Sequence, residues 1–142
     1  MNVSAMVYRR AAEIVERGWC QGEIAKRADG TPLPACRSAE WHKWVERVPW
    51  DEWVEWREWA VRHPEAGQWC AAGARVLACL ELNVSPDIGV GVHYDIDGFN
   101  DAPGRTASEV AAMFREAADI ADRNSWMAVF RDHEPPNWPR QE

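Results

Sequence analysis

Apolar residues at the start of the chain recur with the spacing of an α-helix. At about 100° per residue they fall within one arc, and the charged side chains of the same stretch lie opposite. Gly18 follows in the position where a helix commonly ends. We therefore predict an amphipathic helix over residues 3–17, with an apolar arc made of Val3, Val7, Ala11, Ile14 and Val15.

Tryptophan dominates the segment from residue 38 to residue 63. Ser38 can cap one helix, and Pro49 can begin a second one that stops before Pro64. In this second helix the tryptophans are spaced by three, so the apolar surface covers more than half of the circumference and exceeds the stripe that a surface helix buries. We predict a helical hairpin that carries Trp41, Trp44, Trp50, Trp53, Trp56 and Trp59.

Two further helices are predicted downstream. Residues 65–82 are apolar on nearly every face, which is typical of a central helix. Thr106 and Glu109 have the spacing of a capping box and predict a last helix that ends near Asp122. Glycines and prolines predict a loop or irregular hairpin over residues 19–36 and mostly loop over residues 84–105, where only the run 90–94 could be extended.

These patterns predict a mainly α fold, a small single-domain bundle of about five helices. The 142 residues suffice for one core and leave no room for two. We expect one domain over residues 1–131, with the Trp-rich hairpin at 38–63 as an insert and a long irregular loop before the last helix. The prolines of residues 132–142 predict a flexible tail.

Charge and hydropathy narrow the class of partner. Lys and Arg number 16 against 23 Asp and Glu, a net charge of −7 that disfavours binding to a phosphate backbone. No stretch reaches the ~20 apolar residues of a membrane-spanning helix, and residues 1–17 lack a signal-peptide core. We expect a cytoplasmic protein that binds neither nucleic acid nor membrane. Without any C-x-x-C pair, Cys20, Cys36, Cys70 and Cys79 are expected to be reduced and mostly buried.

No complete catalytic or cofactor-binding motif occurs in the sequence. A nucleophile elbow, a phosphate-binding loop and a dinucleotide fingerprint are all missing. A calcium loop counted from Asp95 fails, because Asn100 stands where glycine is needed and Thr106 where a bidentate glutamate belongs. His93, Asp95 and Asp97 are a weak metal-binding pattern. We predict no catalytic residues, cofactor or metal, and lean towards a protein that is not an enzyme.

The tryptophans of the hairpin have two interpretations. They can fill a small helical core, since each ring buries a large area and the chain has only three Phe. They can also form a binding face, because an apolar arc rimmed with carboxylates suits apolar or cationic groups on another molecule. We predict that the six hairpin tryptophans bind a protein partner, or a second copy of the chain in a homodimer.

Three short motifs consist mainly of Trp, Cys, Gly and polar residues: Trp-Cys-Gln-Gly at 19–22, Trp-Cys-Ala-Ala-Gly-Ala at 69–74, and Phe-Asn-Asp at 99–101 followed by Gly-Arg-Thr at 104–106 and Glu-Val at 109–110. Together these motifs resemble an uncharacterised family of small actinobacterial and actinophage proteins. The resemblance covers the first helix and residues 67–121, and it leaves out residues 38–63. It implies an actinobacterial or phage origin and a domain of unknown function, without any catalytic residue that could be transferred.

The matching residues still have a physical interpretation of their own. The two Trp-Cys pairs could pack together beneath the loop at residues 99–101, with Arg105 paired to a carboxylate, as a structural junction. Alternatively, polar side chains over an apolar floor could bind a small polar ligand, as a small enzyme or a metabolite or metal sensor would. The residues of this alternative site are Trp19, Cys20, Gln21, Asn100, Asp101 and Arg105.

Overall fold

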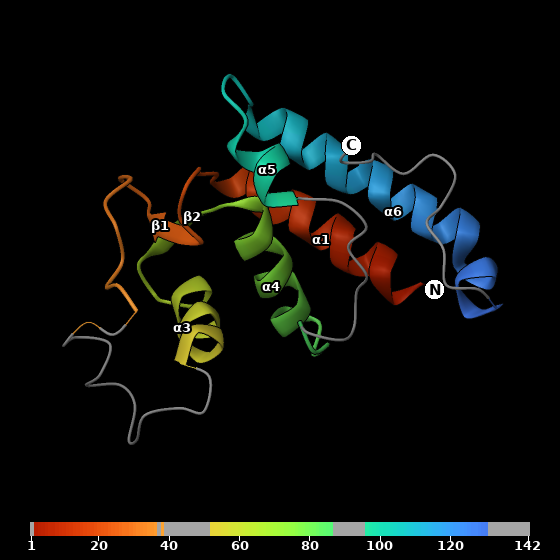
Figure 1. The fold of residues 1–142 in the computed structure, drawn as a ribbon, viewed down its shortest axis with the longest axis horizontal. Helices are drawn as coiled ribbons and strands as arrows, with labels where there is room; N and C mark the ends of the chain where they lie inside the picture. Colours follow the sequence, from red (N-terminus) through yellow and green to blue (C-terminus); the bar gives the residue numbers. More distant parts are fainter. Residues whose placement is uncertain (1, 37, 39–51, 87–95, 131–142) are drawn as a thin grey trace.

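Helices make up most of the described chain. The structure is a computed structural model that describes residues 2–36, 38, 52–86 and 96–130 (Figure 1). Within these residues it has five helices and one two-stranded sheet, so the predicted mainly α fold class is confirmed. The elements are α1 (Val3–Arg17), β1 (Ala25–Arg27), α3 (Glu52–Val61), β2 (Ala66–Trp69), α4 (Ala71–Glu81), α5 (Ile96–Asp101) and α6 (Ala107–Phe130).

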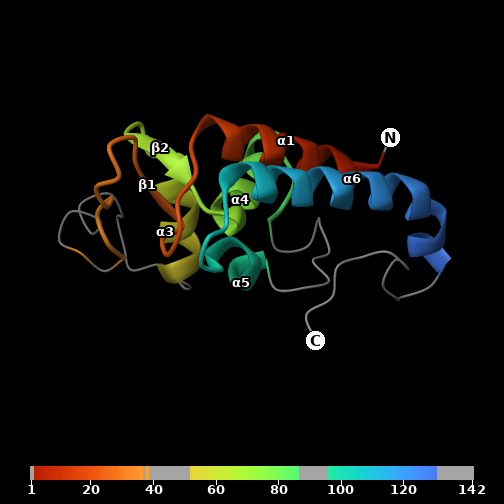
Figure 2. The same ribbon diagram turned by 90° about the horizontal axis from the view of Figure 1, so that it is seen from above.

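Helices α1 and α6 lie side by side, and they form the most extensive contact between any two elements (Figure 2). The predicted bounds of α1 are confirmed, and its buried face packs on α6, where the rings of Tyr8 and Phe114 stack at 6.1 Å. Val3 is the exception to the predicted arc: at the first turn of α1 its side chain is 48% exposed. Ion pairs flank the contact, among them Arg115 with Glu16 at 2.5 Å.

Strand β2 lies between two other backbone segments. On one side it pairs antiparallel with β1, and on the other Trp69 forms a parallel bridge with Trp19. The predicted helix over residues 65–82 is therefore wrong at its beginning, because the backbone of Ala66–Trp69 is used in the sheet. Helix α4 begins only at Ala71, after Cys70 has capped it by accepting a hydrogen bond from the Gly73 N–H.

The end of α4 has the hydrogen bonds of a Schellman motif. The Val84 N–H donates to the Cys79 carbonyl at 2.8 Å, and the Asn83 N–H donates to the Leu80 carbonyl at 3.2 Å. Asn83 accordingly adopts a φ of 58°, the left-handed conformation that this motif requires. The chain leaves α4 here towards the segment before α5.

Two predictions for the second half of the chain need correction. Residues 84–105 were predicted as mostly loop, but Ile96–Asp101 form α5, a short helix that packs on α4. Helix α6 continues to Phe130, beyond the predicted end near Asp122. The first helix of the predicted hairpin, the extended run 90–94 and the tail at 132–142 lie outside the described residues.

No helix among the described residues is both long enough and apolar enough to cross a membrane.

Candidate functional site

Helix α3 carries three of the six tryptophans predicted to bind a partner, and they differ in exposure. Trp53 is 52% exposed, Trp56 is buried at 6%, and Trp59 is half-buried against the core. Each of the two interpretations of the hairpin thus applies to a different ring, since Trp56 fills the core and Trp53 faces outward. Trp41, Trp44 and Trp50 lie outside the described residues.

The aromatic rings of α3 are held by specific contacts. The Trp56 indole donates a hydrogen bond of 2.9 Å to the Pro34 carbonyl, which fixes its ring in the core. Trp53 lies against it, with ring centroids 5.1 Å apart and planes inclined by 30°. Trp59 makes an edge-to-face contact with His63 at 5.0 Å. Trp53 is therefore an exposed ring that rests on a fixed one.

Asn100 is the centre of a junction between three distant segments. Its side chain is almost fully buried, with 1% exposure. Its Oδ1 accepts hydrogen bonds from the Trp19 indole at 2.7 Å and from the Ala71 N–H at 2.9 Å, and its Nδ2 donates to the Cys20 carbonyl at 3.1 Å. The loop after α1, the start of α4 and α5 are thereby tied to one side chain.

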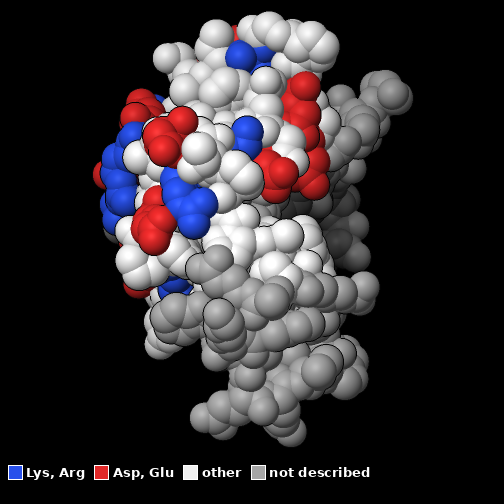
Figure 3. All heavy atoms as spheres, turned by 90° about the vertical axis from the view of Figure 1, so that its left-hand side faces the viewer, with Lys and Arg blue, Asp and Glu red and all other residues white. Residues whose placement is uncertain are grey.

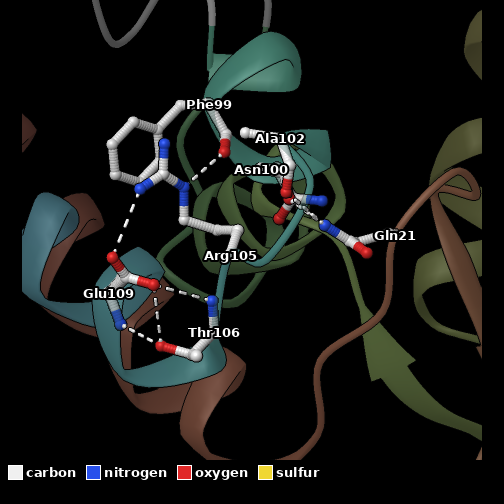
Figure 4. A network of polar contacts seen from close by, with 7 residues as sticks. All are labelled: Gln21, Phe99, Asn100, Ala102, Arg105, Thr106 and Glu109. Atoms are coloured by element: carbon white, nitrogen blue, oxygen red, sulfur yellow. Dashed lines mark hydrogen bonds and ion pairs between the residues drawn. The ribbon is translucent and has the colours of Figure 1, made fainter.

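Gln21 and Asp101 extend this junction at its surface. The Gln21 amide donates to the carbonyls of Asn100 and Ala102, at 2.9 and 3.1 Å (Figure 4). The Asp101 carboxylate accepts from the Gly22 N–H at 3.0 Å and from the Asn100 amide at 2.9 Å. The polar side chains predicted to bind a small ligand are brought together, and they are hydrogen-bonded to one another and to nearby backbone.

Arg105 connects α5 to the beginning of α6. Its Nε donates to the Phe99 carbonyl at 2.8 Å, and its guanidinium carbon lies 3.8 Å from the centre of the Phe99 ring (Figure 4). It also pairs with the Glu109 carboxylate at 3.3 Å, so it has the carboxylate partner that the sequence predicted. Glu109 completes the predicted capping box, because it accepts from the Thr106 N–H at 3.0 Å while its own N–H donates to the Thr106 hydroxyl.

The thiols of the two Trp-Cys motifs are poor nucleophiles at neutral pH. Burial raises the pKa of Cys20 to about 11 and the pKa of Cys70 to about 12. The Cys20 thiol donates to the Glu23 carbonyl, and the Cys70 sulfur is occupied as the cap of α4. Since the thiolate is the reactive form of cysteine, neither group is poised for catalysis.

The second Trp-Cys motif contains a glycine, Gly73, at a position where the backbone of another segment comes very close. A Cβ added at this residue would lie 2.0 Å from the Ile24 carbonyl oxygen, which is backbone and cannot rotate away. The same close approach brings the Ile24 carbonyl within 3.3 Å of the Cys70 N–H, from which it accepts a hydrogen bond. This motif is therefore explained by packing, as is Cys70 at the helix cap.

A metal site receives no support from the part of the chain that is described. Within it, no three side chains of His, Cys, Asp or Glu come together in a way that could hold an ion. Of the weak pattern noted in the sequence, Asp97 lies exposed in the first turn of α5, while His93 and Asp95 are outside the described residues.

A cavity that the sequence did not indicate lies between α3 and the end of α4. Its volume is about 360 Å³. The residues come from two helices and the turn after α4, so no spacing along the sequence connects them. The cavity is lined by Glu58, Arg62, Leu80, Asn83, Val84, Ser85 and Pro86.

The sequence matches the family of unknown function DUF6197 over residues 2–120. The chain belongs to this family. The prediction of an uncharacterised family is thereby confirmed, and the match includes α3 as well as the Asn100 junction. No curated protein and no solved structure matches the sequence. DUF6197 membership therefore assigns no activity to either group of residues, and a function must be argued from their geometry.

Proposed function

We propose that this DUF6197 domain is not an enzyme and that it binds a partner protein through the outward face of Trp53 on α3. The observation that carries the proposal is the 52% exposure of this indole. Among the described residues the other large hydrophobic side chains that are exposed are Val3 and Met6, both on α1. Exposed Trp is costly in water and is enriched at the centres of protein interfaces.

The support beneath Trp53 suits a binding role. Trp56 is fixed by its hydrogen bond to the Pro34 carbonyl, and Trp53 lies on it at 5.1 Å. A ring that is already held in place loses little conformational entropy when a partner covers it, so more of the contact energy appears as affinity. The pair therefore offers a preorganised aromatic anchor.

The expected partner surface combines an apolar side chain with Lys or Arg. Glu55 is exposed on α3, the chain has a net charge of −7, and the face of an indole attracts cations. On the side where β1, β2 and α3 lie, the described surface shows acidic side chains interspersed with basic ones, without a large basic patch (Figure 3). Trp41, Trp44 and Trp50 stay predicted members of the same binding surface.

A selection from a random peptide library displayed on phage tests the proposal. We expect the selected peptides to contain an apolar residue next to Lys or Arg, and to bind Trp53→Ser at least roughly tenfold more weakly than the original chain, as loss of an interface anchor predicts. Val3→Ser, which removes another exposed apolar side chain, is the matched control and should bind normally. Equal binding to both variants contradicts the proposal.

A second copy of the chain is the other occupant that the sequence predicted. Light scattering at micromolar concentration distinguishes the two cases. A homodimer that Trp53→Ser converts to a folded monomer would identify self-association as the role of this surface. A monomeric original chain leaves the partner protein as the occupant.

The alternative function, a small enzyme or sensor built on Trp19, Cys20, Gln21, Asn100, Asp101 and Arg105, has less support. The amide of Asn100 makes its contacts inside the protein, and Cys20 has a raised pKa. A thermal-shift screen with metals and metabolites checks this alternative, because a ligand that binds only the folded state raises its melting temperature. A cytoplasmic location and an actinobacterial or phage origin belong to the proposal as well.

A further inference from the structure

The last part of α6 extends past the beginning of α1. The Asn2 side chain, which caps the start of α1, donates to the Ala121 carbonyl at 3.4 Å. Two turns later in α1, Arg9 pairs with Asp119 at 3.2 Å, so the two helices are antiparallel. Helix α6 therefore continues beyond the start of α1 over residues 122–130, a length of about 13 Å (Figure 2). We call residues 122–130 the α6 extension.

The sequence of the α6 extension is apolar on every side of the helix. It ends in consecutive apolar residues, Trp126, Met127, Ala128, Val129 and Phe130. Successive residues of an α-helix are rotated by about 100°, so such a run reaches the whole circumference. A helix that is apolar on all sides is normally buried. Among the described elements α6 packs mainly on α1, which begins too late to cover this segment, so a cover must come from elsewhere.

The neighbouring start of α1 presents a second apolar surface. Val3 is 48% exposed and Met6 is 37% exposed, and their spacing of three residues places them on one side of the helix. Among the described residues the other exposed large hydrophobic side chain is Trp53, and its helix α3 lies at the opposite end of the molecule (Figures 1 and 2). The α6 extension and the Val3–Met6 pair are therefore two apolar surfaces at the same end of the molecule.

A second copy of the chain can cover both surfaces at once. In a two-fold dimer the same surface of each copy faces the other. When the two α6 extensions lie antiparallel over their whole length, Phe130 of one copy is level with Asp122 of the other. That level is next to Asn2, where α1 begins, so the end of each extension reaches the Val3–Met6 pair of the other copy.

The area available at this end of the molecule is sufficient for a stable dimer. An aromatic side chain buries ~150–250 Å², so Trp126 and Phe130 of the two copies can together bury about 600–1,000 Å². The aliphatic residues of the extension and the Val3–Met6 pair raise this area towards the ~1,200 Å² at which stable interfaces begin. We propose that the chain forms a homodimer through the α6 extension and the Val3–Met6 pair, at a surface separate from Trp53.

Light scattering of the unaltered full chain over a range of concentrations tests the proposal. We expect the mass of a dimer, with a dissociation constant below about 100 µM. A double variant with Val3→Ser and Met6→Ser should weaken the dimer at least roughly tenfold, because both changes remove apolar contact at exposed positions of α1. A monomer at about 100 µM overturns the proposal.

Variants in the two helices locate the interface. Phe130→Ser, at the last residue of α6, should also weaken the dimer at least roughly tenfold. Trp53→Ser is the matched control, since it removes an exposed apolar ring at the other end of the molecule and should leave the dimer unchanged. Circular dichroism checks that each variant is folded. Dimer affinity that is unchanged in either the α1 double variant or Phe130→Ser overturns the proposal, and so does a dimer that only Trp53→Ser dissociates.

Discussion

The Trp19 indole donates a hydrogen bond of 2.7 Å to the side-chain oxygen of Asn100, which lies 81 positions further along the chain. The same oxygen accepts a hydrogen bond from the Ala71 N–H, so the side-chain amide of Asn100 connects the loop after α1 with the start of α4. Two residues that the sequence placed in a candidate ligand site thus act as a structural connection.

Replacing Asn100 with Ala should lower the free energy of unfolding by about 3 kcal/mol or more. The change leaves the Trp19 indole, the Ala71 N–H and the Cys20 carbonyl without their partner, and each buried unpaired group costs ~1–3 kcal/mol. Urea denaturation measures the effect. Trp19→Phe removes only one of the donors and should cost less. A loss below about 1 kcal/mol for Asn100→Ala would contradict the structural role.

Gly73→Ala should destabilise the protein, although Ala is normally the better helix former by about 1 kcal/mol. The new Cβ would lie 2.0 Å from the Ile24 carbonyl oxygen, so β1 and α4 must move apart. Gly104→Ala is the control, because its Cβ would meet open space and only its φ of 79° carries a cost, of about 1–2 kcal/mol. Thermal denaturation should rank Gly73→Ala below Gly104→Ala in stability.

Thr106→Ala should cost about 1 kcal/mol, the usual value for the loss of a helix N-cap. The hydrogen bonds from Thr106 hold the pKa of Glu109 below its usual value. Their contribution to stability is therefore present above the pKa of Glu109 in the unfolded chain, and it is lost as the pH falls through the lowered folded pKa. Denaturation of both proteins at several acidic pH values checks this. The difference in free energy of unfolding between the original chain and Thr106→Ala should shrink as the pH falls. A difference that stays constant would contradict the link between Thr106 and the protonation of Glu109.

Stability should fall as the pH rises from about 9 to about 11. The folded state raises the pKa of Cys20 to about 11 and that of Cys70 to about 12, so in this window the unfolded chain has released protons that the folded chain retains. The free energy of unfolding then decreases with pH. A double variant with Cys20→Ser and Cys70→Ser should lose less stability over this pH range. Melting temperatures of the original chain and the double variant, measured between about pH 9 and about pH 11, check this. Serine keeps an oxygen at the cap of α4.

The sequence predicted those parts of the fold that depend on neighbours along the chain. The periodicity of residues 3–17 and Gly18 defined α1, and Thr106 with Glu109 marked the start of α6. The start of α4 was predicted too early, because β2 is only four residues long and its pairing partners are distant in sequence. Apolar residues in a short paired strand and in a buried helix look alike when only their order is known.

The candidate site was predictable only in part, for a similar reason. The spacing of the α3 tryptophans indicated more apolar surface than one contact could cover, and Trp53 and Trp56 differ accordingly. Which ring is covered depends on where the core ends, and this is not encoded in spacing. The cavity lined by Glu58 and Arg62 could not be recognised in the sequence, because its other wall is the turn after α4, which is distant from α3 along the chain.

The pairing of α1 with α6 determines when the chain can fold during its synthesis. Val7, Ile14 and Val15 are fully or almost fully buried, and α1 makes its largest contact with a helix that begins only at Ala107. Contacts between such distant segments form slowly, because a long loop must close before they are gained. On the ribosome, α1 and α4 are made before α6, so the part of the apolar face of α1 that α6 covers stays exposed until α6 has been made. Chaperones that hold nascent chains can bind that face during this interval.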